Sequence, residues 1–107
     1  MPQADLKYTT DLEFDALAMM ADIEALIARH DSGAGACKAR AYPATLFQHT
    51  HFLLELAILN KPHRDAAFRK ALVADLTALV DGYLPKGTER AVELIFASED
   101  YAPAIVG

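Results

Sequence analysis

The segment from His51 to Leu59 (HFLLELAIL) restricts the possible folds of this chain more than any other stretch. Successive residues of a strand point to opposite faces of its sheet. One face of this strand is entirely apolar and consists of Phe52, Leu54, Leu56 and Ile58. The other face is mostly apolar and consists of His51, Leu53, Glu55, Ala57 and Leu59. Such a strand needs cover on both faces. Two helices cover only one face of a small sheet, so the second face must contact another subunit or a ligand.

The first half of the chain predicts a strand, a helix and a second strand. Residues 3–9 alternate between apolar and polar side chains, which is typical of a half-buried strand. Thr10 and Glu13 have the spacing of a capping box, with Thr10 as the N-cap, which predicts a helix from there to about His30. Residues 36–42 (ACKARAY) predict a short strand that the following proline ends.

The second half repeats this order of elements. Residues 60–65 (NKPHRD) are expected to start a second helix, which Gly82 and Pro85 end. The buried stripe of this helix consists of Phe68, Leu72, Leu76, Leu79 and Tyr83. Residues 89–97 predict a fourth strand, and the tail over residues 98–107 carries enough apolar side chains to dock on the rest of the domain.

The two halves are related by an internal repeat. A displacement of fifty residues aligns identical residues, namely Asp15 with Asp65, Ala16 with Ala66, Ala21 with Ala71 and Leu26 with Leu76. We therefore expect two β-α-β repeats, over about residues 2–42 and 51–97, within one α+β domain that spans residues 1–107. The predicted fold is a four-stranded sheet with both helices on one face.

Composition and charge exclude several classes of function. The net charge of −5 and the pI near 5.2 argue against a nucleic-acid-binding surface. No apolar stretch approaches the ~20 residues that cross a bilayer, so no membrane association is expected. The first residues lack the pattern of a signal peptide. The single cysteine, Cys37, allows no internal disulfide and fits a cytoplasmic location. No motif indicates a cofactor.

Pro2, directly after the initial methionine, admits two interpretations. A proline is harmless as the first residue of a strand, because the missing N–H donor is not needed there. Alternatively, removal of Met1 would make Pro2 a secondary amine that exchanges protons near neutral pH. If Met1 is retained, the Pro2 nitrogen is a tertiary amide and cannot act as a base.

Lys38 and Arg40 are the candidate ligands of an anionic small-molecule substrate. They lie two residues apart on a predicted strand and therefore point to the same face. Arg40 is the stronger candidate, because its planar guanidinium matches a carboxylate with two hydrogen bonds. The alternative for this pair is a solvated strand edge.

Other residues are weaker candidates. Tyr8, Tyr42 and Phe47 are candidates for the wall of an apolar binding site, although ordinary packing accounts for each equally well. Cys37 is interpreted as a small buried hydrophobic residue. His49 and His51 form a His-x-His pair, but no further ligands cluster in the sequence, so no metal site is expected. His63 and Arg64 are expected to be exposed at the start of the second helix.

The chain resembles the tautomerase superfamily and, within it, the family of 5-carboxymethyl-2-hydroxymuconate isomerases. The resemblance spans essentially the whole chain. It rests on Met1-Pro2, on the second strand with Cys37-Lys38-Ala39-Arg40, and on the strand, turn and helix of the second repeat. The turn Asn60-Lys61-Pro62 replaces a Gly-Arg-Ser-like turn, and the connection between residues 42 and 51 is shorter than usual.

This resemblance implies a homotrimer with active sites near the N-termini and the subunit boundaries. It implies that Pro2 is a general base that moves a proton between carbon atoms of an unsaturated keto acid from aromatic-compound breakdown. The resemblance leaves isomerisation, decarboxylation and hydration open as the reaction, since one fold supports several reactions. The alternative is a non-catalytic oligomeric domain with a ferredoxin-like fold. Strand order separates the two folds, because the ferredoxin-like order inserts the third strand between the first and the second.

Overall fold

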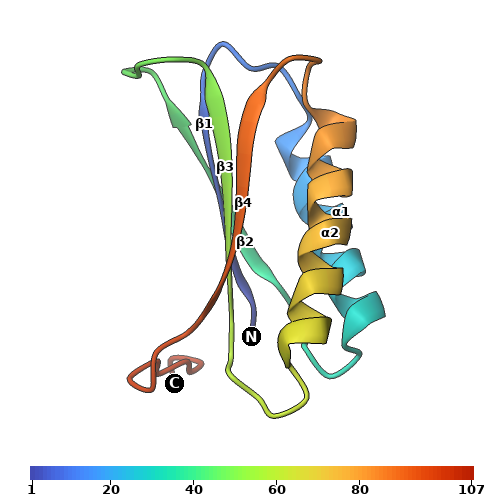
Figure 1. The fold of residues 1–107 in the computed structure, drawn as a ribbon. Coiled ribbons are helices and arrows are strands. Elements are labelled where there is room, and N and C mark those ends of the chain that lie inside the picture. The colour runs from blue at the N-terminus through green and yellow to red at the C-terminus, as the bar shows by residue number, and fades with distance from the viewer.

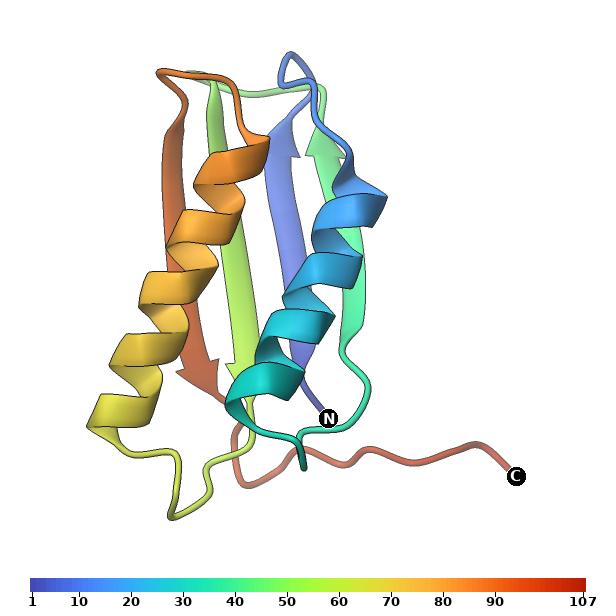
Figure 2. The ribbon, with the colours of Figure 1, turned by 90° about the vertical axis from the view of Figure 1, so that its right-hand side faces the viewer.

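The sheet consists of two central antiparallel strands, each flanked by a parallel neighbour. The computed structural model describes residues 1–107, and its strand order is β2-β1-β3-β4. The strands are β1 (Gln3–Thr9), β2 (Lys38–Ala44), β3 (His51–Ile58) and β4 (Glu89–Phe96). The helices are α1 (Ala16–His30) and α2 (Ala66–Tyr83), and both lie on the same face of the sheet (Figures 1 and 2). The predicted α+β arrangement of two β-α-β repeats is therefore confirmed.

The strand order decides between the two folds considered for the sequence. β1 pairs directly with β2 in parallel, and β3 pairs with β4 in parallel. β1 and β3 pair antiparallel in the middle of the sheet, with Gln3 opposite Ala57. No strand lies between β1 and β2, so the ferredoxin-like order is excluded.

The core fills the space between the sheet and the two helices. β3 shows strict alternation, since its residues with even numbers are buried and those with odd numbers are half-buried or exposed. The central strands contribute Ala4, Leu6, Phe52, Leu54, Leu56 and Ile58 to the core. The helices contribute Met19, Ile23, Leu26, Ile27, Leu72, Leu76 and Val80. Each fully buried large aliphatic side chain contributes about 1.5–3 kcal/mol, so this layer fixes the sheet that carries the N-terminus.

Both helices begin after an aspartate, and this corrects two predictions. Asp15 caps α1 by accepting a hydrogen bond from the N–H of Ala18, 3.0 Å away. Asp65 caps α2 in the same way through the N–H of Phe68, at 2.9 Å. The predicted capping box at Thr10 was wrong, because the chain from Thr10 to Asp15 forms the turn between β1 and α1. Residues 60–64 likewise belong to the connection before α2.

β2 begins and ends two residues later than predicted, at Lys38 and Ala44. The strand continues through Pro43 to Ala44, although proline was expected to end it. Proline lacks the N–H that an inner strand must donate, but β2 is an edge strand, where one side of the backbone needs no partner.

The two ends of the chain meet below the sheet. Figure 2 shows the C-terminal tail crossing beneath the strands and past the N-terminus of β1. The phenol oxygen of Tyr101 contacts Gln3, so the expected docking of the tail is confirmed for this residue. Ile105 and Val106, further along the tail, are almost fully exposed. No helix has the length and apolar character that crossing a membrane requires.

Candidate active site

Pro2 lies between the beginning of β2 and the end of β3. Its side chain is fully buried, and its carbonyl oxygen accepts a hydrogen bond from the N–H of Lys38, 2.9 Å away. The next residue, Gln3, pairs with Lys38 on one side and with Ala57 on the other. Strand pairing on both sides therefore holds the Pro2 backbone in a fixed position.

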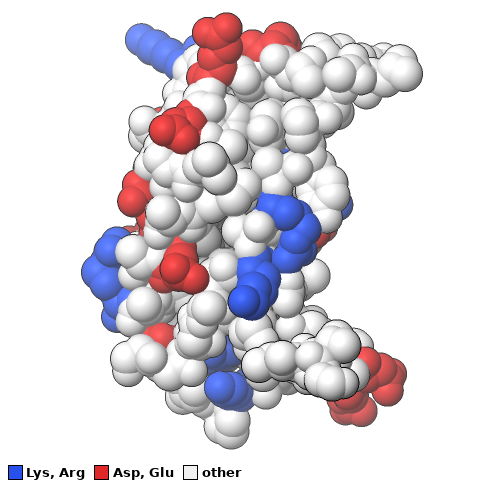
Figure 3. All heavy atoms as spheres, turned by 180° about the vertical axis from the view of Figure 1, so that it is seen from behind, with Lys and Arg blue, Asp and Glu red and all other residues white.

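The two basic residues of β2 lie beside this end of β1, on the sheet face that the helices leave uncovered. Lys38 pairs with Gln3 and Arg40 pairs with Asp5 in the ladder, so their side chains share a face. Figure 3 views the molecule from the β2 side and shows Lys and Arg side chains near the middle of that surface. The structure thus brings Pro2, Lys38 and Arg40 to neighbouring positions of two strands.

Arg40 and Lys38 differ in their partners. Arg40 donates to a carboxylate oxygen of Asp5 at 2.6 Å, to the side-chain oxygen of Gln3, and to the Lys38 carbonyl at 2.9 Å. The side chain of Lys38 forms no ion pair. An incoming carboxylate therefore finds the Lys38 ammonium free, whereas it must share Arg40 with Asp5.

Tyr101 is a site residue that the sequence analysis did not single out. Its phenol oxygen lies 3.0 Å from the amide nitrogen of Gln3 and 3.5 Å from the carbonyl oxygen of Met1. It also borders a hollow of about 330 Å³ that Leu59, Asn60, Lys61, Ala97, Ser98 and Glu99 complete. The only signal in the sequence is a polar aromatic residue between the polar and the apolar part of the tail.

The three predicted aromatic residues lie at the opposite end of the sheet. Tyr8 is six residues from Pro2 along β1, which corresponds to about 20 Å. Its ring packs on the helix side against Phe14 and Phe52, with centroid distances of 4.7 and 6.3 Å. Tyr42 is exposed near the end of β2, and Phe47 is exposed in the connection that follows. Within one chain, these three residues do not meet Pro2.

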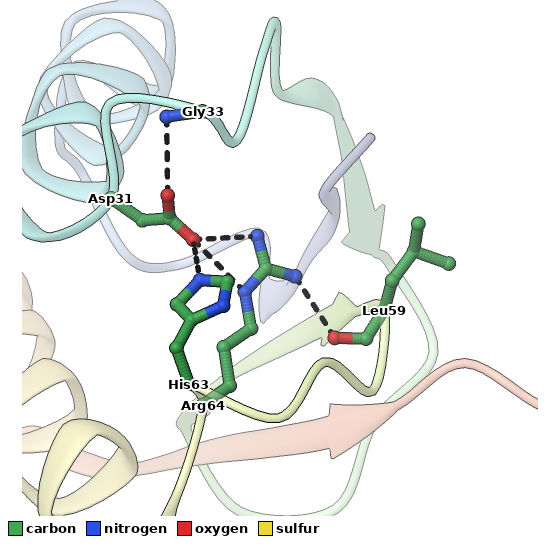
Figure 4. Close-up of polar contacts among 5 residues, drawn as sticks. All are labelled: Asp31, Gly33, Leu59, His63 and Arg64. Atoms are coloured by element: carbon green, nitrogen blue, oxygen red, sulfur yellow. Dashed lines mark hydrogen bonds and ion pairs between the residues drawn. The ribbon is translucent and has the colours of Figure 1, made fainter.

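A buried ion pair joins the two loops that flank the N-terminus (Figure 4). Arg64 is only 4% exposed, which corrects the expectation that it is exposed. Its guanidinium donates to one carboxylate oxygen of Asp31 through Nε at 3.1 Å and Nη2 at 2.9 Å. Nη1 donates to the carbonyl of Leu59 at 2.9 Å. All three nitrogens of Arg64 are used within the fold, so we assign it no role as a ligand of substrate.

Asp31 is the centre of this cluster. Besides Arg64, it contacts Nε2 of His63 at 2.8 Å and accepts from the N–H of Gly33 at 3.1 Å. Hydrogen bonds from His63 and Arg64 lower the pKa of Asp31 from 3.8 to about 2. The cluster links two segments. One is the loop between α1 and β2, which leads into Lys38, and the other is the connection between β3 and α2, which begins at Leu59. The cluster therefore helps to position the beginning of β2 and the end of β3, between which Pro2 lies.

Two further candidates from the sequence have defined surroundings. Cys37 is half-buried, and burial together with Glu24 raises the pKa of its thiol to about 11, so a thiolate nucleophile is disfavoured. The ring of His51 contacts the backbone carbonyl of His49 at 2.7 Å. No group of three His, Cys, Asp or Glu side chains lies close enough together to hold a metal ion.

Comparisons with known proteins give a consistent result at the level of structure. No family model and no curated protein matches the sequence. A solved 5-carboxymethyl-2-hydroxymuconate isomerase from Deinococcus radiodurans R1 is similar, with a TM-score of 0.74 and 19% identity, over 99% of this chain and 90% of that one. A fused 4-OT described as a symmetric trimer has a TM-score of 0.75 and 11% identity, over 98% and 93% of the two chains. The chain has the tautomerase fold.

A third tautomerase-fold structure extends the range of chemistry. It is a malonate semialdehyde decarboxylase inhibited by 3-bromopropiolate, with a TM-score of 0.56 and 10% identity, over 98% of this chain and 91% of that one. The resemblance read from Met1-Pro2 and the two repeats is thereby confirmed for the fold, and the likeness covers the whole chain. Solved proteins with the tautomerase fold thus include an isomerase and a decarboxylase.

Proposed function

We propose that this protein is an isomerase or tautomerase that moves a proton within an unsaturated, carboxylated keto acid, with Pro2 as the general base. The observation that carries the proposal is the buried Pro2 at the head of β1, beside two basic residues of the neighbouring strand. The isomerase named among the similar structures supports this reaction class. We assign the reaction to the cytoplasmic breakdown of aromatic compounds.

The base requires a free Pro2 nitrogen, and therefore a chain without Met1. A free α-amine has a reference pKa of about 7.7–8.0. Burial and nearby cations both disfavour the charged form of an amine. A base with a pKa near the working pH transfers protons efficiently, and such catalysis typically increases the rate about 10²–10⁴-fold.

The substrate carboxylate is assigned to Lys38 and Arg40. The Lys38 ammonium is free of ion pairs, and Arg40 supplies the planar donor pair that suits a carboxylate. Positive charge at this position also stabilises the dienolate that forms when the proton leaves carbon. The pairing of Arg40 with Asp5 holds the guanidinium in place before substrate binds.

We also propose a homotrimer in which the uncovered face of the sheet meets other copies. This face carries a group of neighbouring apolar side chains on β3 and β4, in which Leu53 pairs with Ala91 and Ala57 pairs with Ile95. Ile95 is 42% exposed in the single chain. In such a trimer, the apolar wall of each site would come from Tyr42 and Phe47 of a neighbouring copy, because within one chain they lie too far from Pro2. Tyr8 is not part of this wall, because its ring packs on the helix side of the sheet.

The decisive experiment compares two preparations of one protein. One preparation begins at Pro2 and the other keeps Met1, and mass spectrometry and circular dichroism verify each. Turnover of 5-carboxymethyl-2-hydroxymuconate and of related unsaturated keto acids is measured by ultraviolet absorbance. We expect activity only in the preparation that begins at Pro2. Equal activity in both would refute Pro2 as the base, and folded but inactive protein in both would favour the non-catalytic domain.

A further inference from the structure

The residues beside Pro2 form a chain of hydrogen bonds whose direction is fixed by chemistry. A guanidinium only donates hydrogen bonds, so the side-chain atom of Gln3 that faces Arg40 must be its oxygen. The amide nitrogen of Gln3 then faces Tyr101 and donates to its phenol oxygen at 3.0 Å. Because Gln3 supplies that proton, the proton of the Tyr101 hydroxyl is left to point elsewhere.

The acceptor that this proton finds is the carbonyl oxygen of Met1, 3.5 Å away. The carbon of this carbonyl is bonded to the Pro2 nitrogen, so its oxygen marks a place directly beside the proposed base. The separation is about 0.7 Å longer than a usual O–H···O hydrogen bond. A substrate is not bonded to the Pro2 nitrogen, so its oxygen must lie farther from that nitrogen than the Met1 oxygen does. The long separation between Tyr101 and the Met1 oxygen leaves room for this.

We propose that Tyr101 donates a hydrogen bond to the substrate oxygen that occupies the place of the Met1 carbonyl, and that Gln3 and Arg40 orient it to do so. This inference rests on the proposed function and adds a catalytic residue to it. Tyr101 contacts the substrate, whereas Gln3 is a positioning residue that acts through Tyr101.

The reaction balances without any further reactant. The Pro2 nitrogen takes a proton from the carbon next to the substrate carbonyl, and the electrons of the broken C–H bond form a C=C bond. The carbonyl π electrons move to oxygen, which becomes the negatively charged oxygen of a dienolate. The Tyr101 hydroxyl donates to that oxygen and keeps its own proton. The protonated Pro2 then returns the proton to a more distant carbon, which completes the isomerisation.

The first test is Tyr101→Phe in the chain that begins at Pro2. This substitution removes the hydroxyl and keeps the ring, and we expect kcat/KM to fall about 10- to 100-fold, mainly in kcat. The matched control is Tyr83→Phe, which removes a phenol that binds Asp22 between the helices. The control should have unchanged kinetics. Wild-type kinetics of the folded Tyr101→Phe variant would overturn the proposal.

The second test reverses the direction of the hydrogen bond. In Gln3→Glu, both side-chain oxygens accept, so Arg40 keeps its partner but Tyr101 must donate to residue 3 instead of to substrate. We expect a loss similar to that of Tyr101→Phe, with no further loss when Gln3→Glu is added to the Tyr101→Phe variant. If the added negative charge acts by repelling substrate, its effect persists in the double variant, and Gln3 does not act through Tyr101.

An equilibrium measurement separates this inference from the proposed function. Binding of trans-muconate, an unreactive unsaturated dicarboxylate, to the chain that begins at Pro2 is measured by calorimetry. We expect Tyr101→Phe to weaken binding about 10-fold or less, because a carboxylate oxygen of muconate shares its negative charge with a second oxygen and so carries less charge than the dienolate oxygen. Turnover without any effect of Tyr101→Phe overturns only this inference. Binding that depends on Tyr101 without turnover overturns only the proposed function, and neither binding nor turnover overturns both.

Discussion

The ion pair between Asp31 and Arg64 makes a quantitative prediction for the substitution Asp31→Asn. The pKa of Asp31 falls from its ordinary value of 3.8 to about 2 in the folded chain. One pKa unit corresponds to about 1.4 kcal/mol, so the charged carboxylate stabilises the fold by on the order of 2 kcal/mol. The side chain of Asp31 is only 12% exposed and that of Arg64 only 3%, so solvent screens this pair weakly.

The sign of the pH dependence follows from the lowered pKa. Stability from Asp31 is fully present above pH 3.8, where the carboxylate is charged in the unfolded chain as well. It is lost as the pH falls through about 2, because the folded carboxylate then takes up a proton. We therefore expect Asp31→Asn to lower the free energy of unfolding by about 2 kcal/mol at pH 7, and by progressively less between pH 4 and pH 2.

Urea unfolding followed by circular dichroism at pH 7, 5, 4 and 3 measures this difference, with protein concentration held constant because assembly adds to stability. Asp75→Asn is the matched control. Asp75 pairs with His30, but its side chain is 56% exposed, so we expect a change below about 1 kcal/mol. A difference between wild type and Asp31→Asn that stays constant from pH 7 to pH 3, or that equals the control, would refute the assignment of the stability to this carboxylate.

Two further predictions concern substrate binding and assembly. Arg40→Ala should leave the fold intact and lower kcat/KM by on the order of 10- to 100-fold, because it removes a charge-assisted hydrogen bond to substrate and also releases Gln3; wild-type kinetics would place the anion site elsewhere. Light scattering should show a trimer for the wild-type chain and for Leu17→Lys, which alters an exposed residue of α1. It should show smaller species for Ile95→Lys, which places a charge on the uncovered face of the sheet. A wild-type monomer at micromolar concentration would contradict the proposed assembly.

The sequence predicted the architecture because its signals for the strands and the core are local. The alternation in β3 is contained within one element, and the structure reproduces it. The predicted stripe of the second helix is reproduced in part: Leu72 and Leu76 are buried, the other predicted members are partly buried, and Val80 is buried although it was not predicted. The internal repeat also indicated where the helices begin. The displacement of fifty residues aligns Asp15 with Asp65, and both are N-caps. The local pattern of Thr10 and Glu13 competed with this signal and led to the wrong cap.

The remaining features depend on contacts between distant parts of the chain. Arg64 is buried in a contact with Asp31, which lies 33 residues earlier in the chain. No pattern around residue 64 indicates that contact. Tyr101 reaches Gln3 from 98 residues away, through a tail that has no periodicity. The place of Pro43 inside a strand follows from the position of β2 at the sheet edge, which only the completed strand order reveals.

The two repeats differ in their chemistry, because only the first can begin with a free amine, and the antiparallel pairing of β1 and β3 puts the starts of the two repeats at opposite ends of the sheet. Pro2 precedes β1 at one end of the sheet, and Thr50 precedes β3 at the other. The nitrogen of residue 50 is held in a peptide bond, so duplication of a β-α-β unit doubles the scaffold but not the terminal amine. A circular permutant that opens the chain between residues 45 and 50 and joins Met1 to the nearby tail would keep the sheet. It would move the free amine to the end where Tyr42 and Phe47 lie, far from Lys38.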